Sequence, residues 1–410
     1  MASNIPNDKL FLPPSWRGMA SVLMIAGLIC IMLSAAICYL AGSSEVDGWT
    51  IFCHSYLANY VFCLTICLGA LFFVMVTHLV RASWCASFRR IAELFAFTIP
   101  LWAILFIPIL LTAYTKNDWL YPWALGPDSD LPGIVKNKLD YLNPLWFTIR
   151  VAIYFAVWIF AARFYFTMSR KQDETGDSEI TLKLQKWAGP MIMLFALSVN
   201  FGAFDIVMST DPAWFSTIYG VYIFAASMLS FFATTILSCY LLQRNGRIEK
   251  FVNTEHFQDM SKFQFGFIVF WSYIAFSQFL LYWYGNLPEE TTWYMHRGEH
   301  GWLELGFVLI ALHFVVPFLG TMSRHIRRRK AIMAGWACFI LFVHALDMLF
   351  LVMPYEGIHL SFSLLLGHFV CWAGMFCLFV SIVLMRVGDT PLVAVKDPWL
   401  SESLAYEVGP

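Results

Sequence analysis

One long apolar run ends and the next begins within Phe204-Asp205-Ile206-Val207-Met208-Ser209-Thr210-Asp211-Pro212-Ala213-Trp214-Phe215-Ser216-Thr217-Ile218-Tyr219-Gly220. Asp211-Pro212 in the middle of this stretch predicts a short turn, because proline disfavours a helical conformation in the residue before it. About 20 mostly apolar residues are enough to cross the hydrocarbon core of a bilayer as a helix. The stretch therefore predicts a transmembrane helical hairpin, with an acid, Asp205, inside its apolar part.

The composition of the whole chain supports this interpretation. Of the 410 residues, 60% are hydrophobic and only 13% are charged, and the mean hydropathy is +0.66. A soluble protein of this length needs more charge to cover its surface. The sequence therefore predicts an integral membrane protein of the all-α class. The chain has ten cysteines but no C-x-x-C motif. It therefore lacks the usual motifs for covalently bound c-type haem and for cysteine-bound iron–sulfur clusters.

Ten apolar runs along the chain are long enough to form transmembrane helices. We expect these helices at 18–42, 55–80, 91–115, 146–168, 187–209, 214–243, 262–285, 302–322, 331–354 and 359–386. The longest connection, 116–145, contains several prolines and predicts an ordered or capping loop. The first apolar run is too long for a cleavable signal, and no segment is polar enough for a separate soluble domain. We therefore expect 1–410 to form a single membrane domain.

The distribution of lysine and arginine predicts the orientation. The termini, the even-numbered connections and the adjoining helix ends hold 20 of these residues, whereas the odd-numbered connections hold 4. Basic residues collect on the cytoplasmic side of membrane proteins. Both termini are therefore expected in the cytoplasm. The run Arg327-Arg328-Arg329-Lys330 follows the same pattern, so we interpret it as a topology signal and expect no nucleic-acid partner.

Several ionisable groups lie inside the predicted helices and are candidates for a proton path. A buried carboxylate must be paired, hydrated or protonated, and such groups in membranes commonly mark proton or ion pathways. Arg150 is a candidate partner for Asp205, and His344 lies three residues before Asp347 on the same helix face. The candidates are Asp205, Asp347, His344, His313, Glu304, Arg150, Glu93 and His78. Glu304 and Arg150 would extend the path to the periplasm, and Glu93 and His78 would open it to the cytoplasm.

Three histidines are expected at a common depth. His313, His344 and His368 all fall roughly 14–17 Å from the outer ends of their predicted helices, at about 1.5 Å per residue. A shared depth would suit either a bis-histidine haem or a proton relay. Alternatively, each could be a neutral imidazole that bonds to a nearby helix carbonyl or hydroxyl.

Ionisable residues also indicate an internal repeat. Asp205 and Asp347 each precede a predicted turn, on helices four apart, and Arg150 and Glu304 lie near the outer starts of two other helices four apart. This pattern predicts two four-helix bundles, helices 2–5 and 6–9, flanked by helices 1 and 10.

Three blocks of the sequence are similar to one membrane-protein family. They are 204–220, Phe276-Ser277-Gln278-Phe279-Leu280-Leu281-Tyr282-Trp283-Tyr284-Gly285-Asn286-Leu287-Pro288-Glu289-Glu290-Thr291-Thr292-Trp293-Tyr294, and the tail Asp397-Pro398-Trp399-Leu400-Ser401-Glu402-Ser403-Leu404. The chain resembles the second, smaller NrfD-like membrane subunit of alternative complex III, often labelled ActF. That complex is a bacterial quinol:electron-acceptor oxidoreductase, and the resemblance covers most of the chain.

The resemblance implies a non-haem subunit in the bacterial cytoplasmic membrane that binds no metal or other cofactor itself. It implies as partners a larger NrfD-like membrane subunit, a periplasmic iron–sulfur protein, haem c subunits and a terminal oxidase. Redox catalysis and the main quinol site would then belong to the partners, with quinone near this chain. No catalytic residue is assigned here. The alternatives are a b-haem electron-transfer subunit and a stand-alone secondary transporter.

Overall fold

The computed structural model describes residues 7–44, 46–355 and 357–407, and this part of the chain contains helices and no strand. Ten of its helical segments are long and apolar enough to cross a membrane. Seven are single helices: α1 (Pro14–Leu40), α2 (Gly48–Leu79), α7 (Pro144–Thr175), α9 (Tyr219–Arg244), α10 (Thr254–Gly285), α15 (Lys330–Val352) and α16 (Phe362–Val387). The all-α, multi-pass fold predicted from the sequence is confirmed.

The other three membrane segments consist of shorter pieces. They are α3 (Arg89–Ala96) with α4 (Ile99–Leu105) and α5 (Ile107–Thr112), α8 (Glu179–Ile206) with η4 (Met208–Thr210), and α12 (Trp302–Leu309) with the π-helical η5 (Ile310–Val315) and α13 (Val316–Thr321). Pro100, Pro108 and Pro317 explain most of these breaks, since proline cannot donate the backbone hydrogen bond that continues a helix.

Short helices occur in the connections, before the first membrane segment and after the last. They are η2 (Asn7–Leu10), η3 (Pro122–Leu125), α6 (Gly133–Lys136), α11 (Pro288–His296), α14 (Arg324–Arg327) and α17 (Leu400–Leu404). The connection at 116–145 is an ordered loop, as predicted, with Trp123 buried inside it. Glu356, in the turn predicted before the last helix, lies outside the described residues.

The helix ends differ from the apolar runs in one systematic way. At one end of the molecule α7, α8 and α10 each continue about two turns beyond the apolar residues that predicted them. Their extensions are polar but helix-forming, as in Arg170-Lys171-Gln172-Asp173-Glu174, and Gly176 in a left-handed conformation ends α7. An apolar run in the sequence therefore predicts where a helix crosses the membrane, but it does not predict where that helix begins or ends.

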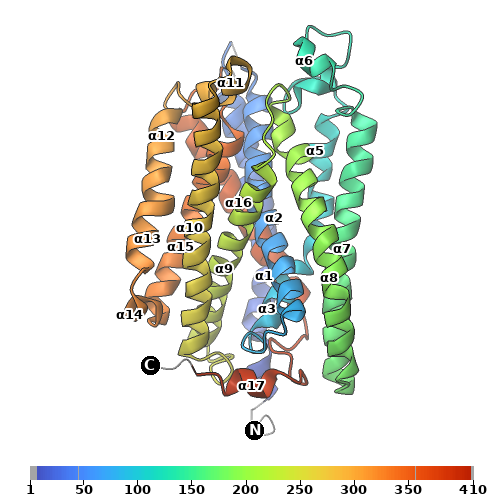
Figure 1. Cartoon of the computed structure of the whole chain (residues 1–410), viewed down its shortest axis with the longest axis vertical. Helices are drawn as coiled ribbons and strands as arrows, with labels where there is room; N and C mark the ends of the chain where they lie inside the picture. The colour runs from blue at the N-terminus through green and yellow to red at the C-terminus, as the bar shows by residue number, and fades with distance from the viewer. Residues whose placement is uncertain (1–6, 45, 356, 408–410) are drawn as a thin grey trace.

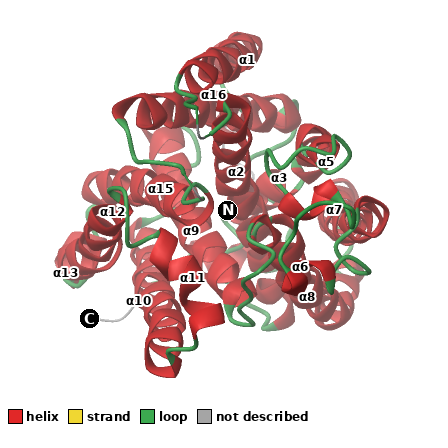
Figure 2. Ribbon diagram, turned by 90° about the horizontal axis from the view of Figure 1, so that it is seen from above, coloured by secondary structure: helices red, strands yellow, loops and turns green. Residues whose placement is uncertain are grey.

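Two groups of four membrane segments meet where α2 packs against α9 (Figure 2). One group contains α2, α3–α5, α7 and α8, and the other contains α9, α10, α12–α13 and α15, while α1 and α16 pack together outside both. At Gly69 a Cβ atom would lie 2.2 Å from the carbonyl oxygen of Ser227, so only glycine permits this approach of α2 to α9. The packing agrees with the predicted pair of four-helix bundles.

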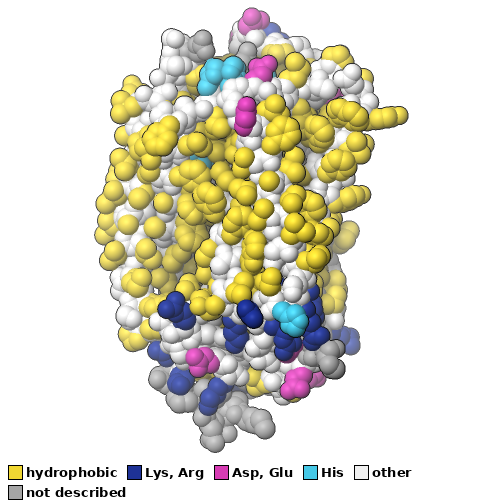
Figure 3. Space-filling model, turned by 90° about the vertical axis from the view of Figure 1, so that its left-hand side faces the viewer, with side chains coloured by type: hydrophobic (Ala, Val, Ile, Leu, Met, Phe, Trp, Pro, Cys, Tyr) yellow, Lys and Arg dark blue, Asp and Glu magenta, His cyan; other side chains and the backbone are white. Residues whose placement is uncertain are grey.

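The two ends of the molecule differ in charge. Lysine and arginine gather at the end that carries α14 and α17, which we call the basic face, and apolar side chains cover the middle (Figures 1 and 3). We call the opposite end, with α6 and α11, the loop face. The apolar middle, with exposed side chains such as Leu281 and Phe307, is the surface that a bilayer would cover.

Candidate functional site

One group of buried polar side chains surrounds Asp347, in the half of the molecule nearer the loop face. We call Tyr222, Trp271, His313, His344 and Asp347 the central cluster. Asp347 accepts a hydrogen bond from the Tyr222 hydroxyl at Oδ1 and one from Trp271 Nε1, 3.1 Å away, at Oδ2. The Nδ1 atoms of His313 and His344 lie 3.9 and 4.0 Å from the same Oδ2.

Local helix geometry positions these groups. His344 and Asp347 lie three residues apart on α15 and share a face, as predicted. His313 lies in the π-helical turn η5, a distortion that commonly accompanies functional sites. Neither ring nitrogen of His313 has a hydrogen-bond partner among the described residues, and its ring centre is 3.8 Å from that of Trp271. His313 therefore has unused hydrogen-bonding capacity beside the carboxyl group.

The second ring nitrogen of His344 connects the central cluster to the middle of the molecule. His344 Nε2 is 3.0 Å from Thr65 Oγ1 on α2, and the Ser230 hydroxyl on α9 donates to Thr65 Oγ1 over 3.4 Å. His368 does not join this group. Its Nδ1 lies 3.3 Å from both Ser55 Oγ and Asn59 Nδ2. The structure thus brings His313 and His344 together but leaves His368 apart, bonded to neighbouring polar side chains.

A second site lies in the other bundle, near the loop face. Arg150 donates two hydrogen bonds to Asp205, as the sequence predicted, and the Tyr154 hydroxyl donates a third over 2.6 Å. Arg150 also lies 3.7 Å above the ring of Tyr141. Glu304, in contrast, is exposed in the first turn of α12, and no described polar contact connects it to the central cluster. Near the loop face, each bundle therefore holds a buried acid, Asp205 in one and Asp347 in the other, with different partners.

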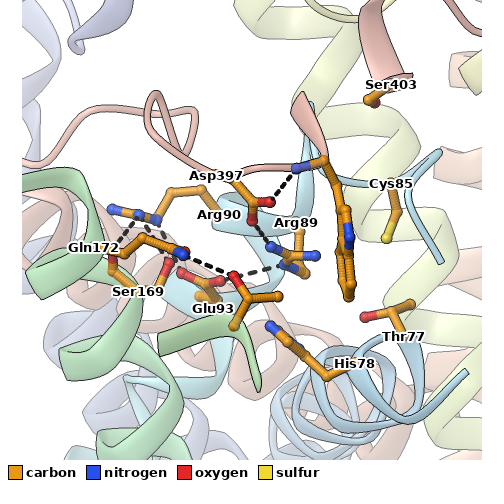
Figure 4. Close-up of polar contacts among 12 residues, drawn as sticks. Thr77, His78, Cys85, Arg89, Arg90, Glu93, Ser169, Gln172, Asp397 and Ser403 are labelled. Atoms are coloured by element: carbon orange, nitrogen blue, oxygen red, sulfur yellow. Dashed lines mark hydrogen bonds and ion pairs between the residues drawn. The ribbon is translucent and has the colours of Figure 1, made fainter. Parts of the chain in front are cut away.

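A third group, the basic-face cluster, contains Arg89, Arg90, Glu93, Asp173 and Asp397. Figure 4 shows how Arg89, Arg90, Glu93 and Asp397 lie relative to one another. Arg89 pairs with Asp397 and lies 3.6 Å from Glu93. Arg90 pairs with Glu93 at 2.9 Å and with Asp173 at 2.7 Å. All five side chains are nearly inaccessible to solvent, with at most 7% exposed.

The C-terminal segment completes this cluster. Asp397 reaches Arg89 from the loop that precedes α17, and Trp399 covers the guanidinium with its ring centre 5.6 Å away. The Ser403 hydroxyl donates to the carbonyl of Trp84, which fixes α17 against the connection before α3. His78 lies beside the cluster, with Nδ1 2.7 Å from the Val74 carbonyl and its other ring nitrogen unpaired among the described residues (Figure 4).

An aromatic layer separates the basic-face cluster from the central cluster. Along α2, Thr65 and His78 are about 20 Å apart, at 1.5 Å per residue. Phe73 lies between them and packs against Phe88 and Phe231. Among the described residues, no chain of hydrogen bonds crosses this layer. The residues predicted to form a path from Glu93 and His78 to Asp347 therefore lie in two separate polar regions, which these hydrogen bonds do not connect.

Arg297 is a buried cation that the sequence pattern did not single out, because it follows α11 in a connection. It donates to the carbonyl oxygens of Trp293, Phe350 and Leu351 at 2.8–3.1 Å and stacks 3.3 Å above the ring of Trp293. Burial lowers the pKa of its guanidinium to about 10, so it stays charged at neutral pH. A positive charge is therefore fixed one helical turn beyond Asp347.

Tyr222, Trp271 and Asp397 are also site residues that the sequence did not reveal. Tyrosine and tryptophan are frequent throughout the chain, so nothing distinguished these two. The spacing Arg89-Arg90-x-x-Glu93 was a local signal for part of the basic-face cluster. In the described ranges, no group of three or more His, Cys, Asp or Glu side chains is arranged to hold a metal ion. Neither a protein-family model nor a curated protein matches the chain.

Proposed function

We propose that this chain is a non-haem membrane subunit of a bacterial quinol-oxidising respiratory complex of the alternative complex III type. The support is the similarity of the blocks at 204–220, 276–294 and 397–404, together with the ten-segment fold and its paired bundles. In this proposal the redox reactions occur in partners: a larger NrfD-like subunit, a periplasmic iron–sulfur protein, haem c subunits and a terminal oxidase. The basic face lies in the cytoplasm and the loop face in the periplasm.

The observation that best supports a role in proton handling is the surroundings of Asp347. A wholly buried carboxyl group with two imidazoles within 4.0 Å can exchange a proton with either ring. These separations exceed a hydrogen bond, so transfer would need a small side-chain rotation or one bridging water. The second ring nitrogen of His344 contacts Thr65, which extends the polar chain toward the contact between the two bundles.

The same geometry favours proton exchange over haem binding. A bis-histidine haem needs its iron and porphyrin between the two imidazoles. Haem iron usually binds imidazole through Nε2, and here Nε2 of His344 lies 3.0 Å from Thr65 Oγ1, while its Nδ1 lies 4.0 Å from Asp347 Oδ2. His344 would have to give up the contact with Thr65 to bind an iron through Nε2. A b-type absorbance band that disappears in His313→Ala or His344→Ala would contradict this part of the proposal.

The composition of the complex tests the assignment as a whole. A tagged copy of the chain, purified in mild detergent from its native membrane, should bring with it a second large membrane subunit, an iron–sulfur protein and c-type haem proteins. A chain that purifies alone and moves a solute across reconstituted vesicles without redox partners would instead identify a secondary transporter.

A further inference from the structure

A pocket of about 660 Å³ opens beside the central cluster, on the outer side of the second bundle. Its walls come from α10, α11, α12 and α15, and Asp347, Tyr222 and Trp271 lie at its inner end. On the side toward the basic face, α10 packs against η5 and α13, and this packing closes the pocket in that direction. We call it the side pocket. Its volume suits an organic ligand of moderate size.

The opening of the side pocket faces lipid. Phe276 on α10, and Leu303, Phe307 and Ile310 on the opposite wall, line it and are 47–64% exposed. They belong to the apolar middle of the molecule, which a bilayer would cover. A molecule that enters between these side chains must therefore be soluble in the membrane.

The inner wall is polar, unlike the opening. Asp347 and Arg297 both line the pocket, and Arg297 bonds to the carbonyl oxygens of Phe350 and Leu351. These residues follow Asp347 by three and four positions, so the guanidinium lies about one turn, roughly 5 Å, farther along α15. A guanidinium has five N–H groups, of which three donate to these carbonyls and that of Trp293, leaving donors for a ligand. The buried amide of Gln278 adds a further polar group.

The shape and charge of this wall favour a flat ring over a phospholipid headgroup. Aromatic side chains border the pocket, among them Trp293, Tyr294 and Phe350, and planar rings pack well against such surfaces. A phosphate would be attracted to Arg297 but would lie close to the carboxyl of Asp347. A neutral ring with an oxygen at each end can instead accept from Arg297 at one oxygen and, through a hydroxyl at the other, donate to Asp347 or to the Tyr222 oxygen, whose own proton is donated to Asp347.

We propose that the side pocket binds a quinone or quinol from the membrane pool, with the ring at Asp347 and Arg297 and the isoprenoid tail leaving between α10 and α12. This inference rests on the proposed function insofar as a quinol-oxidising complex works in a membrane that contains such molecules. It adds a quinone site on this chain itself, separate from any site on the larger membrane subunit.

Photoaffinity labelling tests the inference directly. The intact complex is irradiated with an azido-quinone that carries an isoprenoid tail, and labelled peptides are identified by mass spectrometry. Peptides that contain Phe276 or Phe307 should carry the label. An excess of unmodified quinone should reduce the labelling several-fold, whereas an equal excess of phospholipid should not.

Two glycines provide a matched pair of variants. Gly306 lines the side pocket, and a Cβ atom there would meet the ring of Phe350 at 3.5 Å, an ordinary contact, so Gly306→Phe should fill the cavity without displacing the backbone. Gly266 is exposed on α10 outside the pocket, with no atom within 4 Å of a Cβ. Gly306→Phe should lose the label several-fold, and Gly266→Phe should retain it.

The outcomes separate this inference from the proposed function. Label confined to the larger membrane subunit, or displaced equally by phospholipid, overturns the quinone site but leaves the assignment to the complex intact. Label in the side pocket of a chain that purifies without redox partners supports the site and contradicts the assignment. If Gly306→Phe fails to fold, the position of the label in the unsubstituted chain still decides the question.

Discussion

Arg150 holds both carboxylate oxygens of Asp205: Nε donates to Oδ2 over 2.8 Å, and Nη2 donates to Oδ1 over 3.0 Å. Asp205 is almost completely buried, whereas Arg150 keeps 15% of its side chain exposed. A bidentate pair of this kind satisfies a buried acid without removing its partner fully from water. Tyr154 adds a third donor, so all the charge of Asp205 is compensated locally.

Removal of the Arg150 guanidinium should destabilise the protein substantially. Arg150→Gln leaves a buried carboxylate without its cation, which typically costs about 3–5 kcal/mol. Arg163 is exposed within the same helix, so Arg163→Gln is the matched control and should change stability little. Thermal unfolding in detergent measures both. If the two variants unfold at the same temperature, the pair of Arg150 and Asp205 contributes no more to stability than the exposed Arg163 does.

If the proposed function holds, Asp347→Asn should reduce proton release more than quinol oxidation, because the proposal places the electron path in partner subunits. The measurement is the number of protons released per electron in vesicles that contain the intact complex. Glu304→Gln is the control, since Glu304 is exposed and outside the central cluster. An unchanged stoichiometry in Asp347→Asn would leave Asp347 with a structural role only.

Loss of Asp397 should weaken the basic-face cluster. Asp397→Ala leaves Arg89 buried with only Glu93, 3.6 Å away, and unmatched buried charge typically costs about 3–5 kcal/mol. Asp389 pairs with Arg17 in the same region of the chain, but both are well exposed. Asp389→Ala should therefore cost about 1 kcal/mol or less. Limited proteolysis of α17 should detect the difference, and similar cleavage of both variants would argue against a structural role for Asp397.

Tyr406 should titrate abnormally. Burial, and a hydrogen bond to Asp259, raise the pKa of its hydroxyl from 10 to about 12. The folded state therefore retains this proton more strongly than the unfolded state, so the contribution to stability is complete below pH 10 and is lost as the pH rises toward 12. Tyrosinate absorption of the unsubstituted chain minus that of Tyr406→Phe should show one group that titrates near pH 12. In Asp259→Asn its midpoint should move back toward 10.

The loop face should react with reagents on the periplasmic side. Asp128 is exposed in the connection after the third membrane segment, and a cysteine there should be labelled by a membrane-impermeant maleimide added to whole cells from outside the inner membrane. The unsubstituted chain, which has ten cysteines of its own, provides the background. Labelling that requires access from the cytoplasm would reverse the predicted orientation.

Hydropathy was sufficient to predict the fold class and all ten membrane segments, because apolar length is what a bilayer demands. The pairing of Arg150 with Asp205 could also be predicted, since both lie near the same end of adjacent helices. The polar extension of α7 could not, because helix propensity continues after hydrophobicity ends. The π-helical turn around His313 comes just before Pro317, and the period of apolar residues does not reveal such a change of helix type.

Contacts between distant helices were the least predictable part of the site. Tyr222 and Trp271 reach Asp347 only because of how α9 and α10 are rotated about their axes. In helices that are apolar on almost every side, the sequence gives little information about rotation. The basic-face cluster required, in addition, that the segment around Asp397 fold back onto α3, which no local pattern indicates.

The distance along the chain between Arg89 and Asp397, 308 positions, has a consequence for biosynthesis. A ribosome delivers the third membrane segment long before it delivers the acid that compensates Arg89. Until then this arginine would be costly to bury, so the end of α3 should remain hydrated while the later helices insert. Translation of the segment around Asp397 would then allow Arg89 and Asp397 to pair. A chain that stops before Asp397 would keep Arg89 in water, where cellular quality control can recognise an unpaired charge.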